Sequence, residues 1–240
     1  MRHVCSAFGL IILLLTPAYS FSAQKITQAS HVTFTAHDLL AVAIEELGRS
    51  PVLALFDITQ EVYRVTFSDS FKANDKFTYT GSLLRFGTFV IPGIDLPLLI
   101  GVAMQPGGSD NLFEVRIISK EIGGKIHELQ PSAIQLSNQG GIHIGSLGKG
   151  KVGMVIWEFQ WSEEAHYEPH AYKIKMYDWD ANGKNFVFKR EFLTGQKFVD
   201  GCEALKHYEI PCRDIRDEII PLEKEEITTL GLENLLLNHP

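Results

Sequence analysis

The sequence predicts an all-β protein with about three blade-like units, each of four antiparallel strands, followed by short C-terminal helices. Short runs alternate apolar and polar residues, which is the period of a half-buried strand. Glycine, proline and asparagine separate the runs, as turns require. The layout also recurs, because runs that start with an aromatic residue begin at Tyr63, Phe113 and Tyr172, at spacings of 50 and 59 residues. A four-stranded unit of this period is typical of a blade-like repeat.

The first 20 residues have the layout of a secretory signal peptide. Arg2 and His3 form a short basic start, residues 7–15 are uninterruptedly apolar, and Ala18 and Ser20 fit the −3 and −1 positions of a cleavage site. The apolar run is shorter than the roughly 20 residues of a membrane-spanning helix, so a membrane anchor is the less favoured alternative. We therefore expect a secreted or periplasmic protein with no membrane span once residues 1–20 are removed.

Residues 21–198 are expected to form the repeat-built β domain, and its first unit contains one contested segment. The expected strands are residues 40–44, 52–56 and 63–67, with a fourth from Phe77. Residues 37–47 also fit a helix, because a capping-box pattern precedes apolar residues at helical spacing. We favour a strand there, because the other two units show no helix at the corresponding place.

The second and third units show the strand pattern more clearly. Asn182-Gly183 between the last two runs of the third unit favours a tight hairpin turn. The expected strands are residues 88–91, 98–104, 113–118 and 126 onward in the second unit, and residues 142–144, 152–159, 172–177 and 186–192 in the third.

Residues 199–240 depart from the repeat and form a disulfide loop with a helical or mobile extension. Cys202 and Cys212 are the two cysteines left after signal removal, and in an oxidising compartment a pair ten positions apart predicts one disulfide. Residues 222–230 and 232–237 are leucine-rich and charged, which fits short helices packed on the sheet; a mobile tail is the alternative.

The turn Asp178-Trp179-Asp180-Ala181-Asn182-Gly183 and the repeated hairpins resemble the blades of β-propeller proteins of the FG-GAP/VCBS class, over residues 38–195. The resemblance implies a blade-built fold, and a partial propeller, a stack of sheets or a β-sandwich remain open. Asp178, Asp180 and Asn182 match the opening of a calcium loop, but Lys189 stands at the twelfth position, where a bidentate carboxylate belongs. The hairpin-turn interpretation is therefore preferred, and no cofactor is expected from this segment.

Composition narrows the classes of partner. The formal net charge is −7, and removal of residues 1–20, which hold one arginine and no acid, leaves 21 minus 29, or −8. A general nucleic-acid or anionic-membrane binder would need a basic surface, so the acidic balance argues against both.

The segment from Trp161 to His170 holds the richest group of candidate site residues: Trp161, Glu163, Glu164, His166, Glu168 and His170. In an extended chain His166, Glu168 and His170 share a face, where they could bind a divalent metal such as zinc. The competing interpretation is a polar loop whose histidines bond to nearby backbone. Trp161 is either a core residue, the commoner fate of such a ring, or an anchor for a partner.

Three functions are compatible with this sequence. The favoured one is an exported, soluble binding protein that recognises a protein or envelope component through its strand-connecting loops, since such loops carry recognition. The alternative is a metal-dependent hydrolase that uses the His-x-Glu-x-His loop, with an open metal position for water. A structural repeat subunit of a larger assembly is a third possibility, because uncovered blade edges would need a partner.

Overall fold

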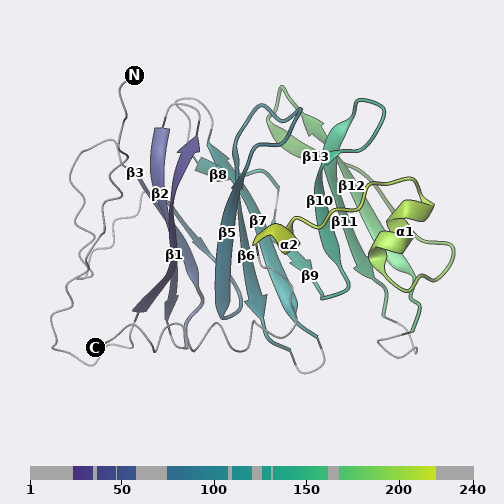
Figure 1. Ribbon diagram of the computed structural model, residues 1–240, viewed down its shortest axis with the longest axis horizontal. Helices are drawn as coiled ribbons and strands as arrows, with labels where there is room; N and C mark the ends of the chain where they lie inside the picture. The colour runs from purple at the N-terminus through teal and green to yellow at the C-terminus, as the bar shows by residue number, and fades with distance from the viewer. Residues whose placement is uncertain are drawn as a thin grey trace, which may run out of the picture.

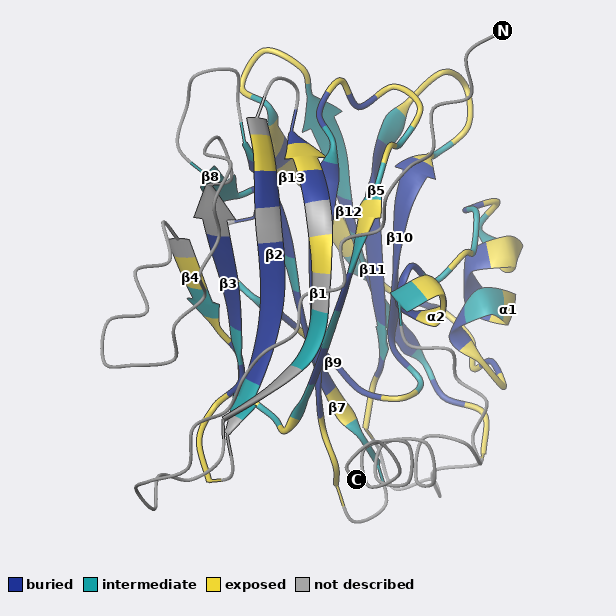
Figure 2. Ribbon diagram, turned by 60° about the vertical axis from the view of Figure 1, so that its left-hand side comes forward, coloured by how far each residue is buried: buried dark blue, intermediate teal, exposed yellow. Residues whose placement is uncertain are grey.

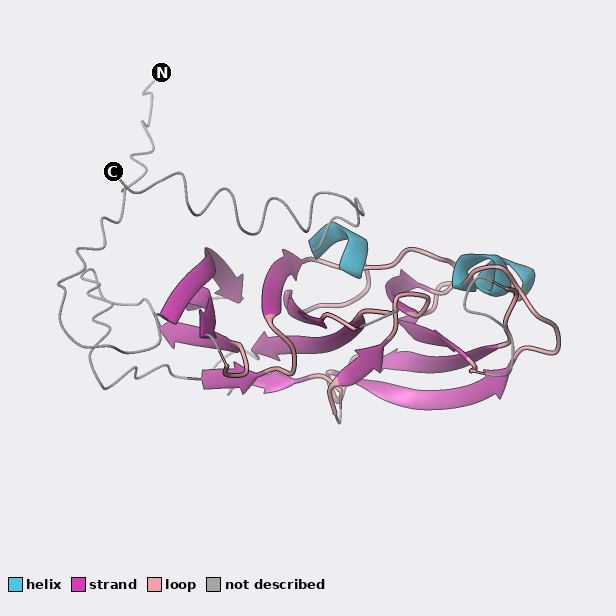
Figure 3. Ribbon diagram, turned by 90° about the horizontal axis from the view of Figure 1, so that it is seen from below, coloured by secondary structure: helices cyan, strands magenta, loops and turns pink. Residues whose placement is uncertain are grey.

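The computed structural model describes residues 24–34, 37–46, 48–57, 75–107, 110–120, 126–130, 132–161 and 168–219. Three antiparallel sheets lie side by side along the long axis of the molecule (Figure 1). Seen from below, they form successive layers, with the helical segments to one side (Figure 3). The all-β prediction is thus confirmed, and so are the antiparallel four-stranded units and the short helices near the C-terminus.

The first sheet has the strand order β1-β2-β3-β4. The contested segment is a strand, because residues 39–45 lie within β2 and pair with both neighbours. The predicted strand at residues 63–67 lies outside the described residues. The strand bounds are β1 (Gln24–Phe34), β2 (His37–Glu46), β3 (Val52–Asp57) and β4 (Asp75–Thr78).

The second sheet has the order β5-β6-β7-β8, and β9 also pairs with β7. Three of the four predicted strands of this unit are present at the expected residues, whereas the first is displaced, because β5 spans residues 83–89 rather than the predicted 88–91. Strand β9 was not foreseen. In β6 every residue except the last is buried, which requires a cover on both faces of the sheet. The bounds are β5 (Leu83–Phe89), β6 (Leu98–Gln105), β7 (Leu112–Lys120), β8 (Ile126–Glu128) and β9 (Ile134–Leu136).

The third sheet has the order β10-β11-β12-β13 and matches the predicted third unit strand for strand. A hairpin turn at residues 181–184 joins the last two strands, and Lys189 Nζ lies 2.6 Å from a carboxylate oxygen of Asp178. The turn interpretation is therefore confirmed, with the lysine paired to the first acidic residue of the segment. The bounds are β10 (Gly141–Ser146), β11 (Val152–Phe159), β12 (Tyr172–Asp180) and β13 (Asn185–Leu193).

The protein has three apolar cores, two of them between the sheets, and the ribbon coloured by burial shows dark blue strands through the interior (Figure 2). The first core joins the first and second sheets, and the second core joins the second and third sheets. Residues of β6 alternate between them, since Leu99 and Ala103 belong to the first core and Ile100 and Val102 to the second. Gly101 leaves room for Tyr79, because a Cβ there would collide with the Tyr79 hydroxyl.

The third core packs helix α1 (Gly201–His207) against the outer face of the third sheet. A Cβ at Gly201 would collide with the indole of Trp157, so glycine allows the helix to approach the strand closely. The predicted disulfide is present between Cys202 and Cys212, with a Cα–Cα distance of 5.3 Å. Helix α2 (Arg216–Ile219) follows, and the helices expected at 222–230 and 232–237 lie outside the described residues. No helix within the described residues is long and apolar enough to cross a membrane.

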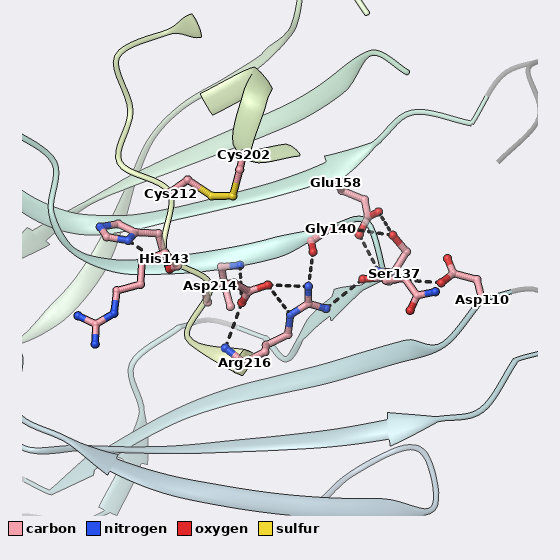
Figure 4. Close-up of polar contacts among 12 residues, drawn as sticks. Asp110, Ser137, Gly140, His143, Glu158, Cys202, Cys212, Asp214 and Arg216 are labelled. Atoms are coloured by element: carbon pink, nitrogen blue, oxygen red, sulfur yellow. Dashed lines mark hydrogen bonds and ion pairs between the residues drawn. A yellow bond between two sulfur atoms is a disulfide. The ribbon is translucent and has the colours of Figure 1, made fainter. Parts of the chain in front are cut away.

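A buried arginine fastens the C-terminal segment to the sheets (Figure 4). Arg216 is 2% exposed. Its guanidinium donates to Asp214 Oδ2 at 2.7 and 2.9 Å, to the Ser137 carbonyl at 3.0 Å and to the Gly140 carbonyl. It also lies 4.6 Å from the ring centroid of Phe113 on β7. One side chain thus joins the tail, the β9–β10 loop and the second sheet.

A buried carboxylate occupies the space between the first and second sheets. Glu114, 2% exposed, accepts hydrogen bonds from the backbone N–H and the hydroxyl of Thr80 and from Arg116 Nε. The Arg116 guanidinium lies over the ring of Tyr79. Burial acts to raise the pKa of Glu114, but the hydrogen bonds from Thr80 and Arg116 together outweigh burial and hold the pKa below its ordinary value.

We predict that Glu114→Gln lowers the free energy of unfolding at pH 7 by about 1–3 kcal/mol, because charge-assisted hydrogen bonds are lost. The folded-state pKa is the lower one, so the carboxylate stabilises the fold above its unfolded pKa and the contribution disappears as pH falls through the folded pKa. Urea unfolding measured from neutral to acidic pH should therefore show that the free energy of unfolding falls less steeply with decreasing pH in the variant than in the unmodified protein. An unchanged slope, equal to that of a surface control such as Asp178→Asn, would contradict this.

We predict that Arg216→Met costs about 3–5 kcal/mol of stability, because Asp214, whose side chain is 10% exposed, is left as a largely buried charge without its partner. The matched control is Arg213→Gln, whose ion pair with Glu218 is exposed and contributes less than about 1 kcal/mol. Thermal and urea unfolding measure both variants. Equal losses in the two would show that Arg216 does not fasten the tail.

Candidate functional site

The third sheet extends beyond its regular strands at one end, which we call the aromatic end and define by Phe159, Trp161, His170, Phe198 and Tyr208. Backbone hydrogen bonds continue the ladder there: Gln160 N–H donates to the Ala171 carbonyl at 2.7 Å, and His170 and Phe198 exchange bonds of 2.9 and 2.8 Å. The residues around Trp161 are therefore held by main-chain pairing up to the point where residues 162–167, which are not described, begin.

Trp161 is 56% exposed, in contrast to the aromatic residues that precede it on the same strand face. Trp157 and Phe159 are 3% and 4% exposed and belong to the third core. The indole of Trp161 packs edge-on against Phe159, with ring centroids 4.6 Å apart. Trp157 and Phe159 on β11 are thus core residues, whereas Trp161, just beyond the end of the strand, exposes its ring to solvent.

The structure separates the other described members of the predicted site. Glu168 is exposed, whereas His170 is completely buried beside Phe159, with ring centroids 5.0 Å apart. Neither ring nitrogen of His170 has a hydrogen-bond partner among the described residues. Glu163, Glu164 and His166 lie outside those residues, and the described part of the chain holds no group of three or more metal-binding side chains. The metal interpretation of His166, Glu168 and His170 therefore stays a prediction.

Helix α1 and its flanking residues make the aromatic end rigid. Asp200 caps the helix by accepting from Glu203 N–H at 2.8 Å, while Glu203 accepts from Val199 N–H at 3.1 Å. The Glu203 side chain thus reaches back to the residue before the N-cap, in an arrangement related to the capping box. The Tyr208 hydroxyl accepts from Gly195 N–H at 3.0 Å, and its ring packs edge-on against Phe192.

Exposed apolar side chains accompany Trp161 at this end of the sheet. Val199 is 64% exposed and Leu193 is 55% exposed. Val199 follows Phe198, which pairs with His170, whereas Leu193 ends β13 opposite Lys173 and so lies on the other face of the sheet from Phe192 and the third core. Trp161 is therefore the large exposed aromatic group of this end, on backbone that hydrogen bonds hold in place.

A second feature is a cavity of about 370 Å³ between β9 and the strands β11 and β12, which we call the inter-sheet pocket. Ile134, Met154 and Ile156 form its apolar floor, and Lys173 and Lys175 lie at its polar side. The volume lies in the range of small-molecule sites, from roughly 300 to 1,000 Å³. The pocket is on the face of the third sheet that is turned toward the second sheet.

Glu158 also lines the inter-sheet pocket, and its carboxylate is engaged by the β9–β10 loop (Figure 4). One oxygen accepts from Ser137 N–H at 2.8 Å and the other from the Ser137 hydroxyl. Burial raises the pKa of Glu158 above its ordinary value, although the hydrogen bonds from Ser137 and the charge of Arg216 partly oppose this. Glu158 therefore acts chiefly as a structural acceptor for the loop.

Sequence reasoning missed the inter-sheet pocket. Lys173 and Lys175 alternate with buried Tyr172, Ile174 and Met176, so the pattern assigns the lysines to a solvent face. The structure places β9 of the second sheet beside that face, while the side chains of Lys173 and Lys175 stay 44% and 42% exposed. The alternation along β12 gave no signal of the pocket, because partly exposed lysines are what a solvent-facing strand face carries.

Comparisons of the chain with protein-family models, with curated proteins and with solved structures gave no match.

Proposed function

We propose that the protein is an exported, soluble binding protein that recognises another protein, of the cell exterior or envelope, through the aromatic end of its third sheet. The observation that carries the proposal is Trp161, a large aromatic side chain that is 56% exposed on backbone held by main-chain pairing. Tryptophan is enriched among the residues that contribute most to protein–protein affinity.

The contact between Trp161 and Phe159 supports this role energetically. A ring that already packs edge-on against a buried neighbour loses little side-chain freedom when a partner covers it. The capped helix α1 and the ladder at His170 and Phe198 likewise hold the surroundings in one arrangement. Preorganisation of this kind raises affinity by reducing the entropy lost on binding.

Charge indicates the chemistry of the partner. The segment 161–170 contains three glutamates and neither lysine nor arginine, and the mature chain carries a formal net charge of −8, from 21 basic and 29 acidic residues. Opposite charges on the two surfaces steer association and disfavour wrong partners. We therefore expect a partner surface with basic side chains around an apolar pocket that accepts the indole.

Two features support export. The N-terminal sequence has the three parts of a signal peptide, and Cys202 and Cys212 form a disulfide, which is typical of oxidising compartments.

For export, we predict that the protein recovered from the periplasm or medium starts at Phe21, or at Ala23 if the alternative cleavage site after Ser22 is used. Intact-mass spectrometry measures the N-terminus directly. Alkylation without reduction should leave Cys202 and Cys212 unlabelled. A cytosolic chain that retains residues 1–20 and reacts at both cysteines would contradict export.

For recognition, we predict that a photoreactive benzoylphenylalanine placed at Trp161 cross-links one protein in intact cells, and that Trp161→Ala weakens binding of that purified partner about thirtyfold. The loss corresponds to about 2 kcal/mol, the lower limit for a residue that dominates an interface. Calorimetry or surface plasmon resonance measures the affinity.

The matched control for this experiment is Phe188 on β13, whose exposed fraction of 55% nearly equals that of Trp161. Phe188→Ala should leave the affinity unchanged, and the photoreactive residue at position 188 should not capture the same protein. Equal effects at both positions would indicate a general apolar surface and would refute recognition through the aromatic end.

A further inference from the structure

The inter-sheet pocket lies away from the surface assigned to protein recognition, and its lining has a defined polarity. It faces the second sheet, whereas Trp161 packs against Phe159 of the third core. Ile134 belongs to β9, and Met154 and Ile156 belong to β11, so the floor is formed by two strands from facing sheets. A ligand with an apolar body would replace water on this floor, which is favourable in proportion to the apolar area covered.

The two lysines at the pocket are only loosely paired with carboxylates. Lys173 and Lys175 lie on the same face of β12 and share a single carboxylate, that of Glu191, at distances of 3.9 and 3.6 Å. Both distances exceed that of a tight charge-assisted hydrogen bond, which is about 2.7–2.9 Å. The carboxylate of Glu158 is occupied by Ser137. The two ammonium groups thus lie near two carboxylates, Glu191 at long distance and Glu158 with its oxygens engaged by Ser137. An anion at the pocket would give both ammonium groups a closer partner.

A buried amide at the pocket also lacks a partner. Gln130 is 6% exposed and lines the pocket. Its Oε1 accepts from Ile117 N–H at 3.3 Å, whereas its Nε2 has no acceptor among the described residues. A buried donor without an acceptor costs about 1–3 kcal/mol, so a ligand oxygen within its reach would recover free energy.

We propose that the inter-sheet pocket binds a small organic carboxylate with an apolar body, such as a medium-chain carboxylic acid. The carboxylate accepts from the ammonium groups of Lys173 and Lys175, and the hydrocarbon part lies on Ile134, Met154 and Ile156. The two lysines favour anionic ligands, because a neutral or cationic ligand would not form charge-assisted hydrogen bonds with them.

The test is calorimetric titration of the folded mature protein with butanoate, hexanoate, octanoate and decanoate below their critical micelle concentrations, and with decanol as the uncharged counterpart. We expect affinity to rise with chain length and decanoate to bind about tenfold more tightly than decanol, because decanol lacks the charge-assisted bonds. Absence of binding by all four carboxylates, or equal affinity for decanoate and decanol, would overturn the proposal.

Variants locate the binding. Lys173→Gln combined with Lys175→Gln should weaken decanoate about tenfold and leave decanol unchanged, whereas Ala133→Phe, which fills the cavity, should weaken both. Lys189→Gln is the control, since Lys189 pairs with Asp178 and does not line the pocket. Circular dichroism and thermal unfolding verify that each variant is folded. Decanoate binding that survives both pocket variants shows an adventitious site and refutes the assignment, whatever the outcome for Trp161.

Discussion

The burial of the second sheet on both faces is the constraint on which the rest of the structure depends. Strand β6 has no solvent face, so its residues fill one core with the first sheet and another with the third. Neither outer sheet could leave without exposing an apolar layer to water, at a cost proportional to the area uncovered. The layered arrangement is therefore one cooperative unit, and the two cores hold the outer sheets in the orientations that create both candidate sites.

Polar groups complete this packing where strands alone leave gaps. Glu114 and Arg116 fill the space beside Tyr79 between the first two sheets, and Arg216 joins the β9–β10 loop to the tail. Buried charges are costly unless paired and hydrogen-bonded, and each of these has several partners. The same loop engages Glu158 through Ser137, so the wall of the inter-sheet pocket is fixed by the network that fastens the C-terminal segment.

Local sequence predicted the second and third sheets well and the sites only partly. Alternation is visible wherever one strand face is apolar, as in β11 and β12. Strand β1 was missed because its first residues are mostly polar, and β9 because three residues carry no period. Trp161 was singled out by its type and place, but its exposure depends on where the third core ends. The pocket and the role of Arg216 arise from contacts between segments far apart in the chain, which no local pattern encodes.

The position of Arg216 near the C-terminus has a consequence for the order of assembly. The three sheets are synthesised before Arg216, so a nascent chain lacks the hydrogen bonds that Arg216 donates to the β9–β10 loop. A chain truncated before Arg216 would leave the buried carbonyl groups of Ser137 and Gly140 without their hydrogen-bond donor. The β9–β10 loop would then be less stable and more accessible to quality-control proteases.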